Sequence, residues 1–261
     1  MKPTIAIVTG GSSGIGLETA RALRARGVTV YALSRRPAEG EHLCCDVSDA
    51  QAVRAAVDEV LAREGRIDLL VNCAGMGISG AMEFTPDADA RRLMEVNVLG
   101  VNNALCAVLP AMRAQRSGRI VNISSVAAVA PIPFQAWYSA SKAAVNALTM
   151  AAANEVRPWG IAVISVMPGD TRTGFTASRR KFEDGDGVYG GRIARSVQKM
   201  ERDEEGGMTA QAAGQKIAKI ALSRSRRPVQ SLGLTYKACA MLAKFLPARA
   251  VRFLLAVLYG R

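Results

Sequence analysis

Three residues near the middle of the chain have the types and spacing needed for proton transfer. The run SVAAVAPIPFQAWYSASK, residues 125–142, contains Ser125, then Tyr138, then Lys142 four positions later. Positions i and i+4 share one face of a helix, so the Lys142 ammonium is expected beside the Tyr138 ring. A positive neighbour favours the phenolate and lowers a tyrosine pKa from about 10. The pattern predicts a general acid/base working near neutral pH; a surface tyrosine and a solvated lysine are the alternative.

A glycine-rich turn near the start of the chain predicts a site for a dinucleotide pyrophosphate. An apolar strand and a helix are joined there by Thr9-Gly10-Gly11-Ser12-Ser13-Gly14-Ile15-Gly16. Gly10 permits a tight turn, Gly14 lets a phosphate approach the backbone, and Gly16 lets the helix pack closely on the sheet. The free N–H groups at the helix N-terminus then attract the anion.

The end of the second apolar strand favours NADP(H) over NAD. Sheets that bind NAD usually carry an acid there, which holds the ribose 2′-hydroxyl. Here the sequence reads Ser34-Arg35-Arg36, with no acid and with two guanidinium groups that can hold a phosphate bidentately. NADP(H) is therefore the predicted cofactor, and two merely solvated arginines are the alternative.

The elements that must position these residues alternate between apolar strands and longer helices. Strands are predicted at 4–9, 28–33, 43–45, 67–71, 118–123 and 161–167. Helices are predicted at 15–26, 49–63, 87–112 and from the tyrosine to about 156. Near-continuous apolar strands are typical of a parallel sheet covered on both faces. With right-handed crossovers this predicts a Rossmann-type, doubly wound α/β domain over residues 1–233.

In these motifs and their order, the chain resembles the short-chain dehydrogenase/reductase family over residues 4 to about 176. The matching positions are the glycine turn, Asn72-Cys73-Ala74-Gly75, Asn97, Ser125 thirteen residues before Tyr138, Lys142, and Pro168-Gly169 followed by Thr173. The segments PIPFQAWYSASK, VRPWGI and PGDTRTGF most resemble the hydroxysteroid-dehydrogenase-like and retinol-dehydrogenase-like branch.

The resemblance implies an oxidoreductase that interconverts a carbonyl and an alcohol. It implies that Tyr138 exchanges a proton with the substrate oxygen, and that Lys142 lowers the tyrosine pKa and holds the nicotinamide ribose. Ser125 is implied to bond the substrate oxygen, and Asn97 to hold a water in the proton relay. The implied cofactor contacts are Thr9, Gly10, Ser12, Ser13, Gly14, Ile15, Gly16, Ser34, Arg35, Arg36, Asp46, Val47, Asn72, Ala74, Gly75, Tyr138, Lys142, Pro168, Gly169, Thr171 and Thr173.

Two other functions stay open at this point. One is reduction of a 3-oxoacyl thioester, against which the lack of a glycine-rich terminal turn argues. The other is a non-catalytic NADP-binding regulatory protein, against which the full set of Asn97, Ser125, Tyr138 and Lys142 argues.

Bulky apolar side chains surround the predicted catalytic residues. We expect Met76, Phe134, Trp137 and Phe175 to form a substrate wall for a bulky hydrophobic compound of the steroid, bile-acid or retinoid kind. Residues 170–207, rich in glycine and charge, predict a mobile substrate lid, with a disordered loop as the alternative. Within it, Asp170 either bonds a substrate hydroxyl or pairs with Arg172.

The net charge of +12 is concentrated in the last third of the chain. Residues 172–261 hold 18 Lys and Arg against 7 Asp and Glu, whereas residues 1–171 hold 16 against 15. Residues 234–261 read as two basic amphipathic helices. Three roles stay open for them: packing on the domain or on a partner subunit, lying on an anionic membrane, or attracting an anionic substrate. Few aromatic residues interleave with the basic ones, so nucleic-acid binding is not expected.

Cysteine and histidine content argues against several kinds of site. The five cysteines have neither metal-ligand spacing nor the pattern of a disulfide framework, so no metal is predicted. His42 is the single histidine, which makes a Ser-His-Asp hydrolase a poor fit.

The chain starts directly with a strand and shows neither a signal-peptide pattern nor about 18 consecutive apolar residues. We expect a cytoplasmic homodimer or homotetramer, with location at a membrane surface as the second reading of the tail.

Overall fold

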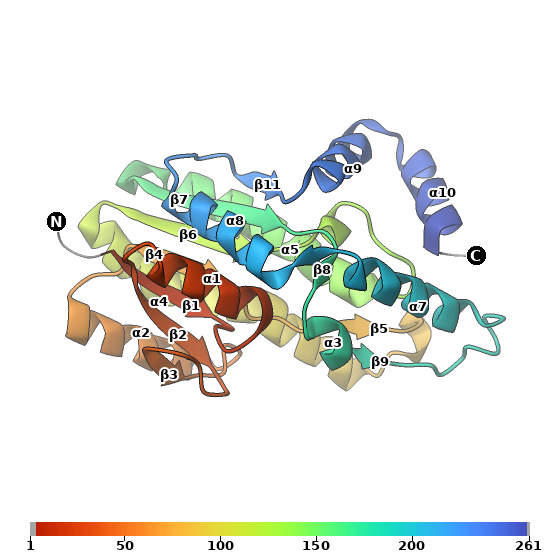
Figure 1. The fold of residues 1–261 in the computed structure, drawn as a ribbon, viewed down its shortest axis with the longest axis horizontal. Helices are drawn as coiled ribbons and strands as arrows, with labels where there is room; N and C mark the ends of the chain where they lie inside the picture. The colour runs from red at the N-terminus through yellow and green to blue at the C-terminus, as the bar shows by residue number, and fades with distance from the viewer. Residues whose placement is uncertain (1–3, 260–261) are drawn as a thin grey trace.

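Seven parallel strands form the central sheet of the structure, which is a computed structural model describing residues 4–259 (Figure 1). They are β1 (Ile5–Thr9), β2 (Thr29–Ser34), β3 (His42–Cys44), β4 (Leu69–Asn72), β6 (Gly118–Ile123), β7 (Ile161–Met167) and β11 (Val229–Ser231). Their order is β11-β7-β6-β4-β1-β2-β3, so the winding direction reverses between β1 and β4. The predicted doubly wound sheet is confirmed. In such sheets ligands bind outside the carboxyl ends of the strands at this reversal.

Helices cover both faces of the sheet because strand side chains alternate between them. Along β1, Ile5 and Ile7 belong to one apolar core, and Ala6 and Val8 to the other. The first core is closed by α2 (Ala50–Glu64), α4 (Gly100–Gln115) and α5 (Ala136–Glu155). The second is closed by α1 (Gly14–Arg24) and α8 (Ala210–Leu222). Both faces of the strands are therefore dry, as their apolar sequences predict.

The long helix predicted over 87–112 is interrupted by one π-helical turn. The chain runs from α3 (Asp87–Met94) through η2 (Glu95–Leu99) into α4. A π turn inserts an extra residue and re-aims side chains, and here Asn97 is turned into the interior with no exposed surface. By length and composition the helix spanning 87–115 could cross a membrane, yet 44% of its most apolar window is buried inside the protein. It serves as a core helix.

The segment predicted as a lid is folded rather than irregular. It contains β8 (Thr171–Arg172), α6 (Phe175–Ser178), β9 (Arg180–Lys181), α7 (Arg192–Glu205) and β10 (Met208–Thr209). β9 pairs with β5 (Ile78–Ser79), and α7 buries Ile193 and Met200 against Ala81. The disordered-loop alternative is therefore wrong, and the mobility of the lid stays a prediction.

Two helices end the described chain, α9 (Leu234–Phe245) and α10 (Ala248–Tyr259). They lie at one end of the molecule, beyond β11 and beside α7 (dark blue in Figure 1). Among the residues whose burial the structure describes, none in either helix is buried. The tail thus forms the two predicted helices without being absorbed into the core.

Candidate active site

The predicted motifs meet in a cavity of about 1210 Å³ at the carboxyl ends of the strands. This is the position that the reversal of strand order predicts. The predicted residues that line the cavity are Gly10, Ser12, Ser13, Gly14, Ile15, Gly16, Ser34, Arg35, Arg36, Asp46, Val47, Ala74, Gly75, Met76, Ser125, Tyr138, Lys142, Pro168, Gly169, Thr171, Thr173 and Phe175. Segments far apart in sequence therefore form one site.

Two predicted cofactor contacts, Thr9 and Asn72, lie beneath the cavity rather than in its wall. Thr9 Oγ1 donates to Asn72 Oδ1 at 3.4 Å and accepts from the backbone N–H of Ala74 at 3.2 Å. Asn72 Nδ2 donates to Asn122 Oδ1 at 2.9 Å, and Asn122 Nδ2 donates to Thr149 Oγ1 at 2.9 Å. This buried network joins β1, β4 and β6 to α5. It holds the catalytic helix in register with the sheet, and it corrects the direct role predicted for both residues.

Phe134 and Trp137 are likewise absent from the cavity wall, although both were predicted there. Phe134 packs edge-on against the ring of Tyr189, with centroids 5.5 Å apart, in the cluster beneath the lid. Trp137 is one residue from Tyr138, which is a turn of about 100° on a helix, so the two side chains diverge. The wall in this segment is made by other residues, namely Val126, Ala127, Ala130, Ile132 and Gln135.

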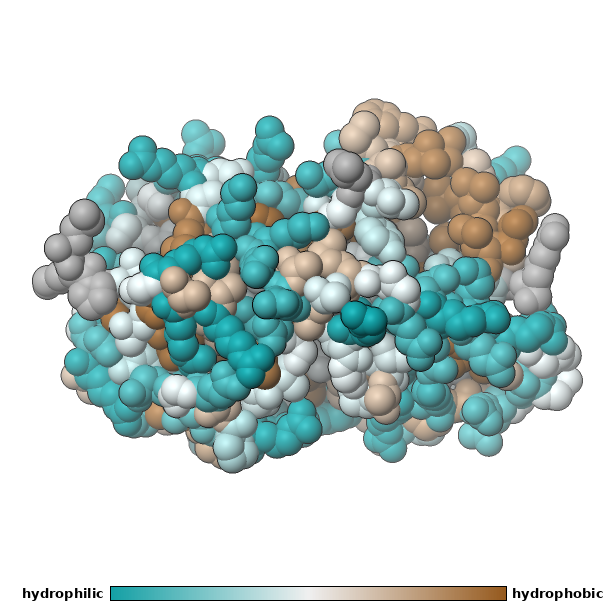
Figure 2. Space-filling model, in the orientation of Figure 1, coloured by the Kyte–Doolittle hydropathy of each residue, from teal (hydrophilic) through white to brown (hydrophobic). Residues whose placement is uncertain are grey.

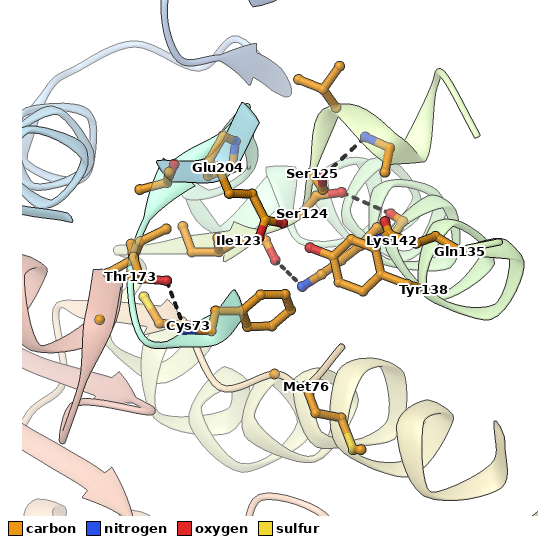
Figure 3. A pocket seen from close by; sticks show the side chains of 18 of the residues that line it. Cys73, Met76, Ile123, Ser124, Ser125, Gln135, Tyr138, Lys142, Thr173 and Glu204 are labelled. Atoms are coloured by element: carbon orange, nitrogen blue, oxygen red, sulfur yellow. Dashed lines mark hydrogen bonds between the residues drawn. The ribbon is translucent and has the colours of Figure 1, made fainter. Parts of the chain in front are cut away.

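The side chains predicted to be catalytic come from α5 and from the end of β6. Figure 3 shows Ser125, Tyr138 and Lys142 pointing toward one another. Lys142 Nζ lies 5.7 Å from the centroid of the Tyr138 ring and donates to the Ile123 carbonyl at 2.9 Å. Ser125 Oγ accepts the Ala127 N–H at 3.1 Å, which leaves its own hydroxyl proton free to donate. The predicted triad is thus assembled around one point.

Burial sets the ionisation of this centre, and it acts against one of our predictions. It raises the pKa of Tyr138 to about 12, although a hydrogen bond with Ser125 and the charge of Arg179 act to lower it. Burial also lowers the pKa of Lys142 to about 8. The prediction of a tyrosine pKa near neutrality is wrong here, because the cost of burying the phenolate exceeds the stabilisation that the Lys142 ammonium, 5.7 Å from the ring centroid, gives it. At neutral pH Tyr138 is a protonated phenol, the form that donates a proton to a carbonyl oxygen.

Asn97 positions the loop that follows β4. Its Oδ1 accepts from Met76 N–H at 2.8 Å, and its Nδ2 donates to the Met76 carbonyl and to Ser141 Oγ, both at 3.0 Å. A methyl group on Gly75 would lie 3.3 Å from Asn97 Oδ1 and 3.6 Å from Lys142 Nζ, so the loop runs close beside both side chains. The relay water implied for Asn97 stays a prediction.

The opposite end of the cavity fits a dinucleotide phosphate. The first turn of α1 contains no acidic residue, and Ser13 precedes it without capping its N–H groups. Gly10 and Gly14 hold positive φ angles of 68° and 54°, which place the turn in a conformation that favours glycine. Arg35 and Arg36 are exposed on the same wall. Free N–H groups and two guanidinium groups suit a pyrophosphate together with a 2′-phosphate.

Several cavity residues could not be found from the sequence. Arg92 of α3 donates at 2.7 Å to Oδ2 of Asp46, which is one of the predicted cofactor contacts. Asp170 does not pair with Arg172, since its Oδ2 accepts the hydroxyl of Tyr236 at 2.6 Å, and its bond to a substrate hydroxyl stays a prediction. Burial raises the pKa of Asp170. Tyr236 lies 66 positions away on α9, and no local signal in the sequence links the two.

A second group in the lid is also a finding of the structure. Glu204 of α7 forms an ion pair with Arg179, whose side chain is 1% exposed, and accepts from Thr176 Oγ1 at 2.5 Å. These bonds hold α6 in place. Its Phe175 ring lies beside the Tyr138 ring, with the two ring centroids 5.7 Å apart. The lid thereby closes one side of the catalytic centre.

Comparison with known proteins gives relatives over the full length of the chain. Residues 4–184 match the family described as short chain dehydrogenase. A 3-ketodihydrosphingosine reductase of Bacteroides thetaiotaomicron is 39% identical, covering 100% of this chain and 99% of the relative. A probable short-chain type dehydrogenase/reductase of Helicobacter pylori is 30% identical over 94% of this chain and 93% of its own. The crystal structure of a short-chain dehydrogenase from Streptomyces avermitilis, 30% identical, superposes with a TM-score of 0.85 over 98% of this chain and 95% of its own.

Tyr138→Phe tests the proton donor. Removing only the hydroxyl should lower kcat for ketone reduction by about 10²–10⁴-fold, the usual contribution of a positioned general acid, while cofactor affinity changes little. Steady-state turnover and NADPH fluorescence titration measure the two quantities. Tyr189→Phe, at a tyrosine outside the cavity wall, is the matched control. Full activity in the Tyr138 variant would refute the mechanism.

Lys142→Met tests the burial of the lysine charge. The lowering of its pKa from 10.5 to about 8 means that the charged form costs the fold about 3 kcal/mol below pH 8. Between pH 8 and 10.5 the lysine is protonated in the unfolded chain but neutral in the folded protein. The free energy of unfolding therefore rises over this range, and the cost of the buried charge disappears. Because the Ile123 carbonyl loses a donor worth about 1 kcal/mol, the variant should gain about 2 kcal/mol at pH 7.

Urea denaturation of the protein without cofactor, at pH 7 and above pH 10, measures this gain. The gain should be present at the lower pH and absent at the higher. Lys216→Met, at an exposed position of α8, serves as the control and should change stability little. A Lys142→Met variant that is less stable than the parent at pH 7 would contradict the account.

Proposed function

The chain belongs to the short-chain dehydrogenase family, and from that premise we propose that it reduces the ketone of a long-chain lipid with NADPH. The observation that carries the proposal is the reach of the cavity. It extends from Tyr138 and Ser125 to apolar side chains of α9 and α10, among them Leu242, Leu254 and Leu258. An apolar channel that starts at a proton donor suits a ketone carried on an alkyl chain.

The chain's own residues account for the steps other than hydride transfer. Bound NADPH supplies the hydride; its phosphates would be held by the α1 N-terminus with Arg35 and Arg36, and its nicotinamide ribose by Tyr138 and Lys142. Ser125 Oγ donates a hydrogen bond to the ketone oxygen and orients it. Tyr138 then gives its phenolic proton to that oxygen as negative charge develops there. The Lys142 ammonium stabilises the phenolate that remains.

The relative from Bacteroides supports a particular member of this substrate class. Its name states 3-ketodihydrosphingosine as its substrate, and the likeness includes the tail helices that line the cavity. Two carboxylates, Asp170 and Glu204, also line the cavity, but both already have partners: Asp170 accepts the Tyr236 hydroxyl and Glu204 pairs with Arg179. The preference for an amino ketone over a 3-oxoacyl thioester therefore rests on the likeness to this relative.

Steroid-, bile-acid- and retinoid-like carbonyl compounds share the apolar character that the sequence predicts, and they belong to the same proposal as competing substrates.

A homodimer or homotetramer is also part of the proposal. It is supported by exposed apolar side chains near the core helices, where Leu99 is 52% and Met150 51% exposed. Such side chains on adjoining helices are typical of subunit interfaces.

Arg35→Ala tests the choice of cofactor. Loss of one charge-assisted contact to the 2′-phosphate, worth about 1.5–3 kcal/mol, should lower kcat/KM for NADPH by about 10- to 100-fold. The value for NADH should change little, because NADH lacks that phosphate. Steady-state kinetics with both cofactors measure the ratio. Arg54→Ala, an exposed arginine on α2, controls for loss of charge, and an unchanged NADPH/NADH ratio in the Arg35 variant would sink the cofactor proposal.

A panel of ketones tests the substrate. With NADPH, kcat/KM should be greatest for 3-ketodihydrosphingosine and should rise by about fourfold for each methylene added to short-chain analogues, until the cavity is filled. The panel also includes a ketosteroid, an oxo bile acid, a 3-oxoacyl thioester and, as an aldehyde, retinal. Higher kcat/KM for the steroid or the thioester would overturn the long-chain proposal, and no turnover with any of them would contradict the reductase itself.

A further inference from the structure

The apolar side chains that face solvent are concentrated on α9 and α10. Of the twelve large exposed hydrophobic residues in the described chain, seven lie in these two helices. Phe245 is 76% exposed and Phe253 65%. Figure 2 shows hydrophobic side chains gathered at the end of the molecule where Figure 1 places these helices. A concentration of this kind marks an interaction surface rather than ordinary scatter.

The same helices carry positive charge only. Their exposed basic residues are Lys237, Lys244, Arg249 and Arg252. No acidic residue follows Glu205 anywhere in the sequence. On α9 the two lysines share a face with Met241 and Phe245, because these positions recur at three- and four-residue steps. An apolar face flanked by cations is the pattern of a helix that lies in the interface of an anionic bilayer.

Two tyrosine hydroxyls tie the helix pair to the lid. Tyr236, near the start of α9, donates to Asp170 Oδ2 at 2.6 Å. Tyr259, at the end of α10, donates to Asp203 Oδ2 at 3.1 Å. The two ends of the pair are therefore fixed to the catalytic domain. Phe245 and Phe253, on either side of the connection between the helices, remain exposed.

The exposed surface continues into the catalytic cavity. Leu242, Leu254 and Leu258 line the cavity that contains Tyr138, and each is at least 42% exposed to solvent. Apolar side chains therefore run from the outer surface into the cavity that contains the reacting centre, and an alkyl chain can follow them.

We propose that α9 and α10 dock on an anionic membrane surface and receive the lipid substrate there. The proposal rests on the proposed function only for what enters the cavity, since the docking itself depends on the exposed side chains. In this arrangement Phe245 and Phe253 enter the headgroup region, and the basic residues contact lipid phosphates. The mouth of the cavity then opens toward the acyl chains.

A second copy of the chain is the competing occupant of this surface, and charge argues against it. A two-fold interface places the same patch of each copy against the other. The basic residues of both helix pairs would then meet, and this part of the chain carries no acid to offset them. An anionic bilayer offers the opposite charge over the whole surface.

Vesicle sedimentation of the full chain tests the proposal. The protein should bind vesicles of phosphatidylcholine with phosphatidylglycerol, bind phosphatidylcholine alone far more weakly, and dissociate as salt rises. Lys237→Gln/Lys244→Gln should lower binding by at least about tenfold, since each cation near an anionic surface contributes about fivefold. Phe245→Ser/Phe253→Ser should abolish it. Neither phenylalanine lines the cavity, so turnover of a soluble short-chain ketone should be unchanged.

Matched variants away from the tail separate docking from a general effect of charge or apolarity. Met82→Ser, at a residue 66% exposed, and Lys216→Gln/Lys219→Gln on α8 should bind as the parent does. Failure of the parent to sediment, or equal binding to both vesicles, would overturn the proposal. So would sedimentation-equilibrium data in which Phe245→Ser/Phe253→Ser dissociates an oligomer, together with no vesicle binding by the parent. Vesicle binding without turnover of any ketone would contradict the proposed function alone.

Discussion

Desolvation of two ionisable side chains on one helix is the constraint on which the rest of the site depends. Lys142 is buried and Tyr138 partly buried, and this desolvation lowers the lysine pKa to about 8 and raises the tyrosine pKa to about 12. Both shifts have burial as their largest cause, since burial disfavours the charged form of each side chain. The charged form of lysine is the protonated cation, so its pKa falls, and that of tyrosine is the deprotonated anion, so its pKa rises. The consequence is a neutral phenol beside a mostly protonated ammonium at neutral pH, which suits proton donation to a ketone.

The polar groups around this centre hold it in place. The chain of hydrogen bonds from Thr9 through Asn72 and Asn122 to Thr149 fixes α5 to the sheet. Asn97, turned inward by the π turn, fixes the loop on the other side of Lys142. Buried amides of this kind are costly unless fully bonded, so each makes several hydrogen bonds. The lid and tail then complete the cavity with apolar side chains, which extend the dry region away from Tyr138.

Local sequence patterns predicted the parts of the site that depend on neighbours in the chain. The glycine turn, the i and i+4 spacing of Tyr138 and Lys142, and the strand periodicity each need only a few adjacent residues, and β6 and β7 match their predicted ranges. Tertiary contacts decided the rest. The π turn at Asn97 and the position of Phe134 against Tyr189 depend on packing, and the bond between Asp170 and Tyr236 joins segments 66 residues apart. The predicted lowering of the tyrosine pKa was wrong because spacing alone does not reveal burial.

The pH dependence of hydride transfer in a single turnover tests the central claim most directly. The account predicts that the rate of ketone reduction by bound NADPH is constant through neutral pH. It should then fall with one ionisation near pH 8, as Lys142 loses the charge that stabilises the Tyr138 phenolate. A rate that rises through neutral pH, or that stays unchanged above pH 9, would contradict it.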